Sequence, residues 1–299
     1  MSWHLGPLCP FDIESTGVDV ENDRVVTATV ARIQPGRDTQ IRSHLIAVDV
    51  DIPEGATAVH GITTEHARAN GKPAREVLDA VAADLADALA AGTPVVGCNL
   101  AYDFTILDRE LRRHGLPTLE DRLCGWITPV IDVFVIDKAV DRYRPGGRKL
   151  VDLCSHYGVR IDGAHDAEFD ALAAARVAYR IGQRAHMPTS RLVDLYADRK
   201  YPDRLAKTLQ SLASMTLTEL HQAQIGWYAT QAEGLAAYWL RQANELEHLA
   251  GRTADDAERE TRLADAEDLR RRAETVTTDW PIRPWREPAP TLSTAGRTA

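Results

Sequence analysis

Long apolar runs are scarce in this sequence of 299 residues. No stretch approaches the roughly 20 consecutive apolar residues that a membrane-spanning helix needs. The first ten residues, MSWHLGPLCP, also lack the charged start and the apolar stretch of a signal peptide. We therefore expect a cytoplasmic protein that makes no contact with a membrane.

Cysteine is scarce as well. The four cysteines lie far apart and form no C-x-x-C pair: Cys9, Cys98, Cys124 and Cys154. This spacing excludes the common zinc-finger patterns, and cytoplasmic thiols are normally kept reduced. The sequence therefore predicts four free thiols, with neither a disulfide nor a zinc site.

Net positive charge is missing too. The chain has 35 basic and 44 acidic residues, which gives a net charge of −9. That balance argues against a protein that coats nucleic acid through bulk charge. One dense basic strip remains, in a predicted loop, and it either meets substrate phosphates or is simply solvated. It contains Arg142, Arg144, Arg148 and Lys149.

The most informative segment is FDIESTG, residues 11–17, which places two carboxylates in an apolar run. Side chains alternate along a strand, so Asp12 and Glu14 point to the same side. Two carboxylates beside a core repel each other and lose solvation, and a divalent cation removes both costs. Thr16 and Gly17 then turn the chain and offer backbone N–H groups. The alternative is a pair of salt-bridged carboxylates at the end of a strand.

The order of the predicted elements indicates the fold. Apolar segments bounded by turn residues predict strands at 8–14, 24–34, 41–50, 94–99 and 130–136. Helical spacing predicts helices at 74–91, 103–114, 150–157 and 167–185. Three strands with short links form an antiparallel meander, and β-α alternation follows. This pattern predicts an α/β, RNase H-like domain with a five-stranded mixed sheet.

The remainder of the chain has only helical patterns. Thr216 and Glu219 have the spacing of a capping box, ahead of a helix of about 33 residues, roughly 50 Å long. Gly251 ends this helix, and a second one runs to about Thr275. We predict an all-α helical hairpin. The expected regions are a first domain at 1–186, a helical extension at 187–286 and a flexible tail at 287–299.

Further chemical groups occur at two other places. Asp103 follows the strand predicted at 94–99, where it either caps a helix or holds a metal ion. Asp170 lies inside a predicted helix, and His165 precedes that helix at a position suited to a general base. The alternative is a surface histidine beside Asp166 as the helix cap.

Four segments in order resemble the motifs of the DEDDh exonuclease family: FDIESTG, HGIT (60–63), GCNLAYDF (97–104) and HDAEFDA (165–171). That family includes the proofreading epsilon subunit of bacterial DNA polymerase III, RNase T and oligoribonuclease. The resemblance covers about residues 8–185. Residues 186–285 are similar to the helical C-terminal extension of members from actinobacteria and their phages, and the family gives no role for it.

The resemblance implies the chemistry of the site. Four carboxylates would bind two Mg²⁺ or Mn²⁺ ions, and His165 would be the general base. The implied activity is a 3′→5′ exonuclease that removes nucleoside 5′-monophosphates from single-stranded or frayed DNA ends. One alternative is an exoribonuclease of the RNase T or oligoribonuclease type. Another is a weakly active adaptor that binds nucleic acid. The metal-binding carboxylates are Asp12, Glu14, Asp103 and Asp170.

Substrate contacts are expected around these groups, and His60 could instead cap a turn. The residues expected to contact substrate are Ser15, Thr16, Gly17, His60, Ile62, Asn99, Phe104, Arg144 and Arg148. The helical hairpin has an aromatic stripe that includes Trp227, Tyr238 and Trp239. We expect this stripe to pack on the first domain, on a second copy of the chain or on a protein partner.

Overall fold

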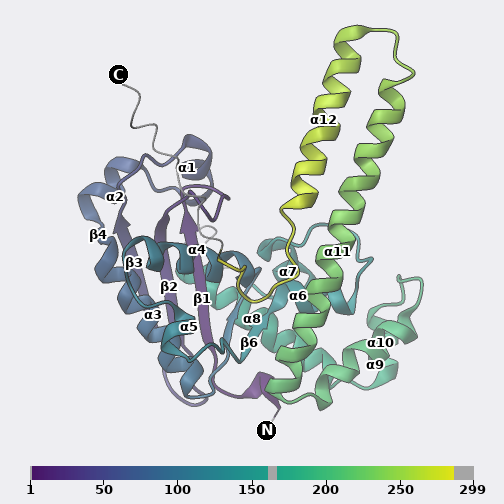
Figure 1. The fold of residues 1–299 in the computed structure, drawn as a ribbon. Helices are drawn as coiled ribbons and strands as arrows, with labels where there is room; N and C mark the ends of the chain where they lie inside the picture. The colour runs from purple at the N-terminus through teal and green to yellow at the C-terminus, as the bar shows by residue number, and fades with distance from the viewer. Residues whose placement is uncertain (1, 161–166, 286–299) are drawn as a thin grey trace, which may run out of the picture.

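A six-stranded mixed sheet organises the first half of the chain (Figure 1). The computed structural model describes residues 2–160 and 167–285. The strand order is β4-β3-β2-β1-β5-β6. The strands are β1 (Cys9–Ser15), β2 (Val25–Arg32), β3 (Gln40–Ala47), β4 (Lys72–Pro73), β5 (Val95–Gly97) and β6 (Val130–Asp132).

The predicted meander is confirmed, because β1, β2 and β3 pair antiparallel in sequence order. β5 and β6 continue the sheet in parallel beyond β1. β1 is therefore a central strand, and the carboxyl ends of three parallel strands meet at one edge of the sheet. The sixth strand, β4, has only two residues and pairs with β3, and the sequence pattern did not reveal it.

Helices cover both faces of the sheet. They are α1 (Glu54–His60), α2 (Thr64–Asn70), α3 (Ala74–Ala90), α4 (Leu100–Arg113), α5 (Leu119–Arg122), α6 (Val133–Val140), α7 (Leu150–Tyr157), α8 (Ala167–Ala185), α9 (Thr189–Leu195), α10 (Pro202–Ser211), α11 (Leu217–Ala250) and α12 (Asp256–Glu274). Two 3₁₀ turns lie at Trp3–Leu5 and Leu212–Ser214. No helix in the described ranges is long and apolar enough to cross a membrane.

Two hydrophobic cores lie on the two sides of the sheet. One joins Phe11 of β1 to Leu78 of α3 and Leu107 of α4. The other joins Ile131 of β6 to α8, and it also contains Leu209 of α10. The second core therefore extends past residue 186, and the helical extension shares it with the first domain.

The fifth predicted strand is wrong in its second half. Residues 130–132 form β6, and the chain then turns directly into α6. The Asp132 carboxylate causes this change, because it accepts hydrogen bonds from the N–H groups of Phe134 (3.0 Å) and Val135 (3.4 Å). Asp132 is thus the N-cap of a buried helix, and the apolar residues after it belong to α6 rather than to a longer strand.

α11 closes the outer edge of the sheet with polar side chains. Gln224 accepts from the N–H of Asp132 (2.7 Å) and donates to the carbonyl of Val130 (2.9 Å). His221, one turn earlier, accepts from the N–H of Val130 through Nδ1 (3.3 Å). An edge strand normally needs a partner strand or solvent for these groups. Here the side chains of a helix satisfy them in a buried setting.

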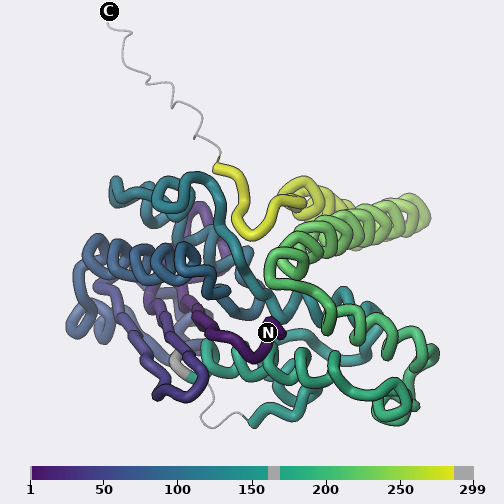
Figure 2. Tube along the Cα trace, turned by 90° about the horizontal axis from the view of Figure 1, so that it is seen from below, coloured from purple at the N-terminus to yellow at the C-terminus, as the bar shows by residue number. Residues whose placement is uncertain are grey.

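The predicted helical hairpin is confirmed, and it projects from the body on the side away from β3 (Figures 1 and 2). Its two helices approach closely because small side chains lie between them: Ala243, Ala250 and Ala266 are buried. Arg270 of α12 pairs with Glu247 of α11 at 2.8 Å.

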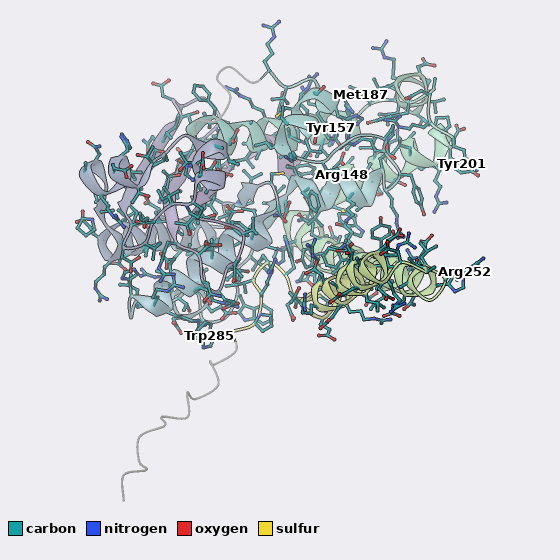
Figure 3. The ribbon with its side chains drawn as sticks, turned by 90° about the horizontal axis from the view of Figure 1, so that it is seen from above. Arg148, Tyr157, Met187, Tyr201, Arg252 and Trp285 are labelled. Carbon is teal, nitrogen blue, oxygen red and sulfur yellow. The ribbon has the colours of Figure 1, made fainter. Side chains whose placement is uncertain are left out.

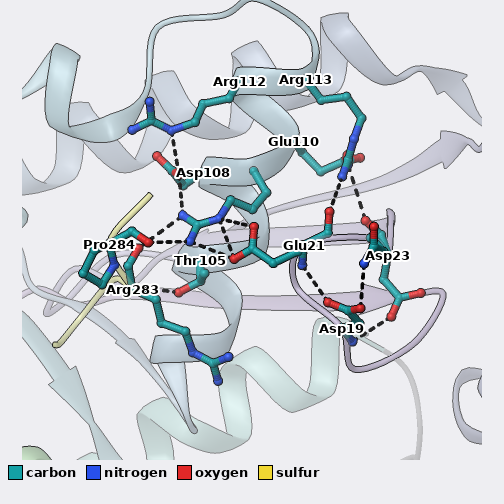
Figure 4. A network of polar contacts seen from close by, with 12 residues as sticks. Asp19, Glu21, Asp23, Thr105, Asp108, Glu110, Arg112, Arg113, Arg283 and Pro284 are labelled. Atoms are coloured by element: carbon teal, nitrogen blue, oxygen red, sulfur yellow. Dashed lines mark hydrogen bonds and ion pairs between the residues drawn. The ribbon is translucent and has the colours of Figure 1, made fainter. Parts of the chain in front are cut away.

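Residues 280–285, called the strap below, return from the hairpin to the sheet domain. Arg109 of α4 is buried and donates to the carbonyls of Arg283 (3.2 Å) and Pro284 (3.0 Å) (Figure 4). The same guanidinium pairs with Glu21 in the β1–β2 turn at 2.9 Å. Trp285 lies under it, with its ring 5.2 Å from the guanidinium carbon. The strap is thereby fixed to α4, far earlier in the sequence.

Candidate active site

Four predicted carboxylates line one hollow of about 560 Å³ at the carboxyl edge of the parallel strands. Asp12 and Glu14 come from β1, Asp103 from α4 and Asp170 from α8. These elements are separated by up to 158 residues of sequence, and the sheet order brings them together. The structure thus assembles the carboxylate set that the sequence predicted.

The pair on β1 has the geometry expected of alternating strand residues. Ile13 between them is buried in the core, whereas Asp12 and Glu14 face the hollow. One carboxylate oxygen from each of Asp12, Glu14 and Asp170 lies within 4.8 Å of the others. Oxygen donors at this spacing fit a hard divalent cation such as Mg²⁺ or Mn²⁺.

Asp103 lines the same hollow without belonging to that group of three, and it is held by the strand itself. Its Oδ1 accepts a hydrogen bond from the N–H of Ile13 (3.0 Å). α4 begins at Leu100, so Asp103 lies inside the first turn rather than at the cap. The positive end of the helix dipole favours a carboxylate there. The N-cap alternative for Asp103 is therefore wrong, and Asn99 occupies that position.

The cluster holds negative charge that the protein itself does not neutralise. Burial, and then the carboxylates of Asp103, Glu14 and Asp170, raises the pKa of Asp12 well above its usual range. Burial and the charge of Asp170 raise the pKa of Glu14 to about 7. Burial likewise raises the pKa of Asp103, against the opposing effect of its backbone hydrogen bonds. A bound cation would reverse these shifts, because it favours the ionised carboxylates.

The turn after β1 is fixed by side-chain hydrogen bonds. Ser15 donates to the carbonyl of Gly17 (2.7 Å), and the Tyr102 hydroxyl donates to that same carbonyl (2.6 Å). Thr16 is buried, and its hydroxyl donates to Asp23 (2.7 Å). A Cβ at residue 17 would lie 2.5 Å from the Asp23 carboxylate, so a larger residue there would displace the side chain that accepts from Thr16. The predicted substrate contacts of Ser15, Thr16 and Gly17 stay predictions.

The HGIT segment joins two short helices. Gly61 has φ +75° and ends α1, and Thr63 caps α2 by accepting from the N–H of His66. His60 is buried, and its Nδ1 accepts from the N–H of Ile62 (3.1 Å), so it does cap this turn. Its Nε2 is buried without a hydrogen-bond partner in the described chain. Contact of His60 and Ile62 with a nucleotide stays a prediction.

Of the predicted substrate-contact residues Asn99 and Phe104, only Asn99 lies at the hollow. Asn99 lines the hollow beside the carboxylates. Phe104 is fully buried in the core, where its ring packs against Phe11 at 5.7 Å. Because residues one position apart on a helix differ by about 100° in direction, Asp103 and Phe104 cannot face the same side. The structure therefore does not bring Phe104 to the site.

Of the predicted basic strip, Arg148 and Lys149 line the hollow, whereas Arg144 is buried away from it. Arg144 is buried and binds the buried Asp137 carboxylate (3.2 Å) and the carbonyl of Gly147 (2.9 Å). Arg148 also pairs with Asp137 (3.0 Å) but lines the hollow. Lys149 is exposed and lines the hollow as well. Substrate contact by Arg144 stays a prediction, and its burial gives it a structural role.

Sequence reasoning assigned no site role to several residues that line the hollow, among them Phe134 and Leu150. Phe134 lines the hollow because α6 starts directly after Asp132. Leu150 begins α7 beside Lys149 and lines it too. The position of Phe134 could have been found from Asp132, because Asp is a favoured N-cap residue and an apolar segment follows it, which indicates a helix that starts at residue 133. His165 and its predicted role as general base lie outside the described residues.

Residues 10–178, more than half of the chain, match the RNase T family, whose description is "Exonuclease". The chain belongs to this exonuclease family. That range contains all four carboxylates of the hollow. The family is one of nucleases that use divalent metal ions, which agrees with the oxygen donors gathered here.

Relatives of known description match a little more than half of the chain. A PolC-type DNA polymerase III from Streptococcus thermophilus is 25% identical over 170 residues, which are 56% of this chain and 11% of that protein. The homologous enzyme from Streptococcus agalactiae is 24% identical over 180 residues, 60% of this chain and 11% of that protein. The chain thus matches about a ninth of the length of these relatives.

Solved structures show the same fold. Escherichia coli Exonuclease I in complex with a dT13 oligonucleotide superposes with a TM-score of 0.50 at 20% sequence identity. The match covers 67% of this chain and 46% of that one. The predicted RNase H-like exonuclease fold of the DEDD type is therefore confirmed.

Proposed function

We propose that the protein is a metal-dependent 3′→5′ exonuclease that releases nucleoside 5′-monophosphates from single-stranded or frayed DNA ends. The observation that carries this proposal is the convergence of four carboxylates from three elements on one open hollow. Asp12, Glu14 and Asp170 have the oxygen spacing to hold divalent cations. Divalent cations at such a site stabilise the charge that develops on the attacked phosphate and on the departing oxygen.

The residues of this chain position both the carboxylates and the substrate. The N–H of Ile13 holds Asp103 in place, so this carboxylate needs no rearrangement when substrate arrives. Lys149 and Arg148 line the same hollow, where they can contact a phosphate. Asn99 can donate a hydrogen bond to the same strand. His165 is proposed as the group that removes the proton from the attacking water.

DNA is the favoured substrate for two reasons. The described relatives are DNA polymerases, and the structural neighbour with the bound oligonucleotide holds DNA. Because the site works on a strand end, the terminal nucleotides must be unpaired to reach the carboxylates.

The test uses oligonucleotides labelled at one end. With Mg²⁺ or Mn²⁺, a 5′-labelled single strand should shorten to a ladder, and the released units should be 5′-mononucleotides. EDTA should stop the reaction, and a 3′-phosphate should slow it. Release of dinucleotides, or cutting of circular single strands, would contradict the proposal. Faster degradation of the matching RNA would assign the protein to the exoribonuclease alternative.

A further inference from the structure

Three further hollows continue from the candidate active site toward the helical extension. The first shares Asn99 and Phe134 with the carboxylate hollow and has a volume of about 250 Å³. The second, about 380 Å³, shares Lys138 with the first. The third, about 620 Å³, shares Arg142 and Tyr143 with the second. Because neighbouring hollows share lining residues, the four lie next to one another in a row, called the groove below.

The groove runs between α6 and α11 and ends at the turn between α9 and α10. Lys138 and Gln231 line its first part, and Trp227 and Tyr238 of α11 line the middle. Tyr201 lies at its outer end, and Arg148 lies between Tyr201 and the sheet when the molecule is seen from above (Figure 3). The helical extension therefore supplies one whole wall of a path that leads to the carboxylates.

Positive charge along this groove is not neutralised by the protein. Asp141 is the one carboxylate among the described residues that line these three hollows, and Arg199 pairs with it at 3.1 Å. Within the described chain, no carboxylate pairs with the groove cations Lys138, Arg142, Lys200 and Arg204. In a chain of net charge −9, unpaired cations gathered in one groove favour an anionic ligand there.

The groove also repeats one pairing of a cation with an aromatic ring. Lys138 lies over Phe134 (5.4 Å), Arg142 over Tyr143 (5.7 Å), and Lys200 over Tyr201 (5.3 Å). The side chains of Tyr143 and Tyr201 are exposed, with relative accessibilities of 85% and 60%. Single-stranded nucleic acid needs this combination, because cations contact its phosphates while exposed rings stack on its bases.

Two buried polar atoms in the first hollow are without partners. In the described chain, Nε of Arg283 and Oε1 of Gln231 are buried and make no hydrogen bond. Nearby, burial and the charges of Arg148 and Arg142 lower the pKa of Lys138. A nucleotide in this hollow could satisfy both atoms, because its phosphate can accept from Nε of Arg283 and a base N–H can donate to Oε1 of Gln231. Its negative charge would also reduce the repulsion between the cations.

We infer that this groove binds the single-stranded part of the substrate upstream of the terminal nucleotide, and that the helical extension is a nucleic-acid clamp. The inference rests on the proposed exonuclease function, because it places the 3′ end at the carboxylates. The strand then passes Lys138 on α6, crosses Arg142 and Tyr143, and leaves at Lys200 and Tyr201. Strands that reach the outer end should bind more tightly than strands that fill only the carboxylate hollow.

The test measures binding without cleavage. Fluorescence anisotropy of the full chain in EDTA compares oligo-dT strands of about 4 and about 20 nucleotides. The Arg142→Ala, Lys200→Ala, Arg204→Ala triple variant should bind the long strand at least about tenfold more weakly than wild type. The salt slope of its log affinity should fall by about 2, since each lost phosphate contact on a single strand removes about 0.7. Lengthening the strand should no longer improve affinity.

A matched control removes the same charge from the same region. Arg191 of α9, Lys207 of α10 and Arg241 of α11 are exposed and do not line the groove. Their triple alanine variant should bind both strands as wild type does. The Tyr143→Leu, Tyr201→Leu variant should weaken binding of the long strand while leaving the salt slope unchanged, because stacking releases no counterions.

The two proposals fail in different ways. If wild type cleaves DNA but the groove triple variant binds the long strand as the control does, the groove inference is overturned and the exonuclease function stands. If wild type shows no cleavage with any divalent ion while the groove variants still lose affinity, the exonuclease function is contradicted. Binding of single strands in the groove is then still supported. If wild type forms a dimer that buries Tyr143 and Tyr201, the inference that the groove binds nucleic acid is also overturned.

Discussion

At the scale of single residues, Asp137 explains why a basic strip does not act as one unit. This carboxylate is fully buried, and it receives Arg144, Arg148 and the hydroxyl of Tyr157 (2.9 Å). Removing one partner of a buried ion pair leaves an uncompensated charge, which costs about 3–5 kcal/mol. Lys149, next to Arg148 in sequence, is exposed and makes no such contribution.

The two roles can be separated by substitution. Arg144→Ala should lower the free energy of unfolding by about 3 kcal/mol or more, as measured by urea denaturation. Lys149→Ala should leave stability within about 0.5 kcal/mol of wild type but raise KM more than it lowers kcat. Its salt slope should fall by about 0.7. A stable Arg144→Ala protein with a raised KM would show instead that Arg144 contacts substrate.

Asp12 gives the sharpest residue-scale test of metal binding, because burial and then three other carboxylates raise its pKa. Asp12→Asn keeps the size of the side chain and should lower the cleavage rate by at least about 10³-fold. In wild type, Mg²⁺ or Mn²⁺ at about 100 times its dissociation constant should stabilise the fold by about 2.7 kcal/mol, seen as a rise in Tm. The variant should show little of that rise.

Asp87 supplies the control for this experiment, since its exposed carboxylate lies on α3, outside the hollow. Asp87→Asn should match wild type in rate and in the metal-dependent rise of Tm. A folded Asp12→Asn protein with near wild-type cleavage would rule out the metal site at β1.

At the scale of elements, α11 satisfies the edge of β6 through a histidine that must stay neutral. Nδ1 of His221 accepts the N–H of Val130, and the Trp280 ring lies 5.1 Å from the imidazole. Burial lowers the pKa of His221 to about 4. A protonated ring would lose its acceptor and place a charge in the core.

This shift predicts a pH dependence of stability. The pKa of His221 is lower in the folded protein than its ordinary 6.5, so its contribution is complete above pH 6.5 and is lost as pH falls toward 4. Between pH 7 and 5, the loss from this one group is about 2 kcal/mol. His221→Asn keeps an acceptor without titrating, so its unfolding free energy should fall by about 2 kcal/mol less than that of wild type. If wild type and the His221→Asn variant lose the same unfolding free energy between pH 7 and 5, the pH dependence comes from other groups.

The elements also show which patterns the sequence could reveal. The meander and α3 were predictable because their apolar residues repeat with the period of a strand or a helix. The segment after Asp132 was not, because a short apolar run has the same composition in a buried strand and in a buried helix. The side of α4 that Phe104 faces depends on where the helix starts, three residues before the predicted position.

The site was predictable for a different reason. Asp12, Glu14, Asp103 and Asp170 are residue types placed in an order that a family shares, so no packing was needed to find them. Lys149 and the groove beyond Lys138 depend on how α6 and α11 pack, which is set by contacts between residues about 90 positions apart. Such contacts leave no local signal in one sequence.

At the scale of the whole molecule, the two expected regions share their packing. Leu192, Leu209 and Leu220 belong to the same core as Ile131 and Val177. Trp3 donates from its indole to the carbonyl of Leu212 (2.9 Å), which joins the start of the chain to the helical extension. The domain boundary at residue 186 stays a prediction, and the second hydrophobic core contains residues from both sides of it.

Truncation tests this shared packing. A chain ending at residue 186 keeps the four carboxylates but exposes the second core and the edge of β6, so it should be poorly soluble. Gln224→Leu in the full chain is the milder probe, since it leaves two buried backbone groups of β6 unpaired and should cost about 2–4 kcal/mol. A soluble, monomeric and fully active 1–186 fragment would contradict this account.

The strap has a consequence for how the protein is made. Arg109 binds the carbonyl of Arg283, which is translated 174 residues later. At about 5–20 residues per second, a ribosome needs roughly 9–35 s to cover that distance. During that interval the guanidinium of Arg109 has Glu21 and Asp108 as partners but lacks the two carbonyls of the strap. The packing of the nuclease is therefore completed only after the strap has been translated, and a nascent chain stalled before the strap is more exposed to chaperones and proteases.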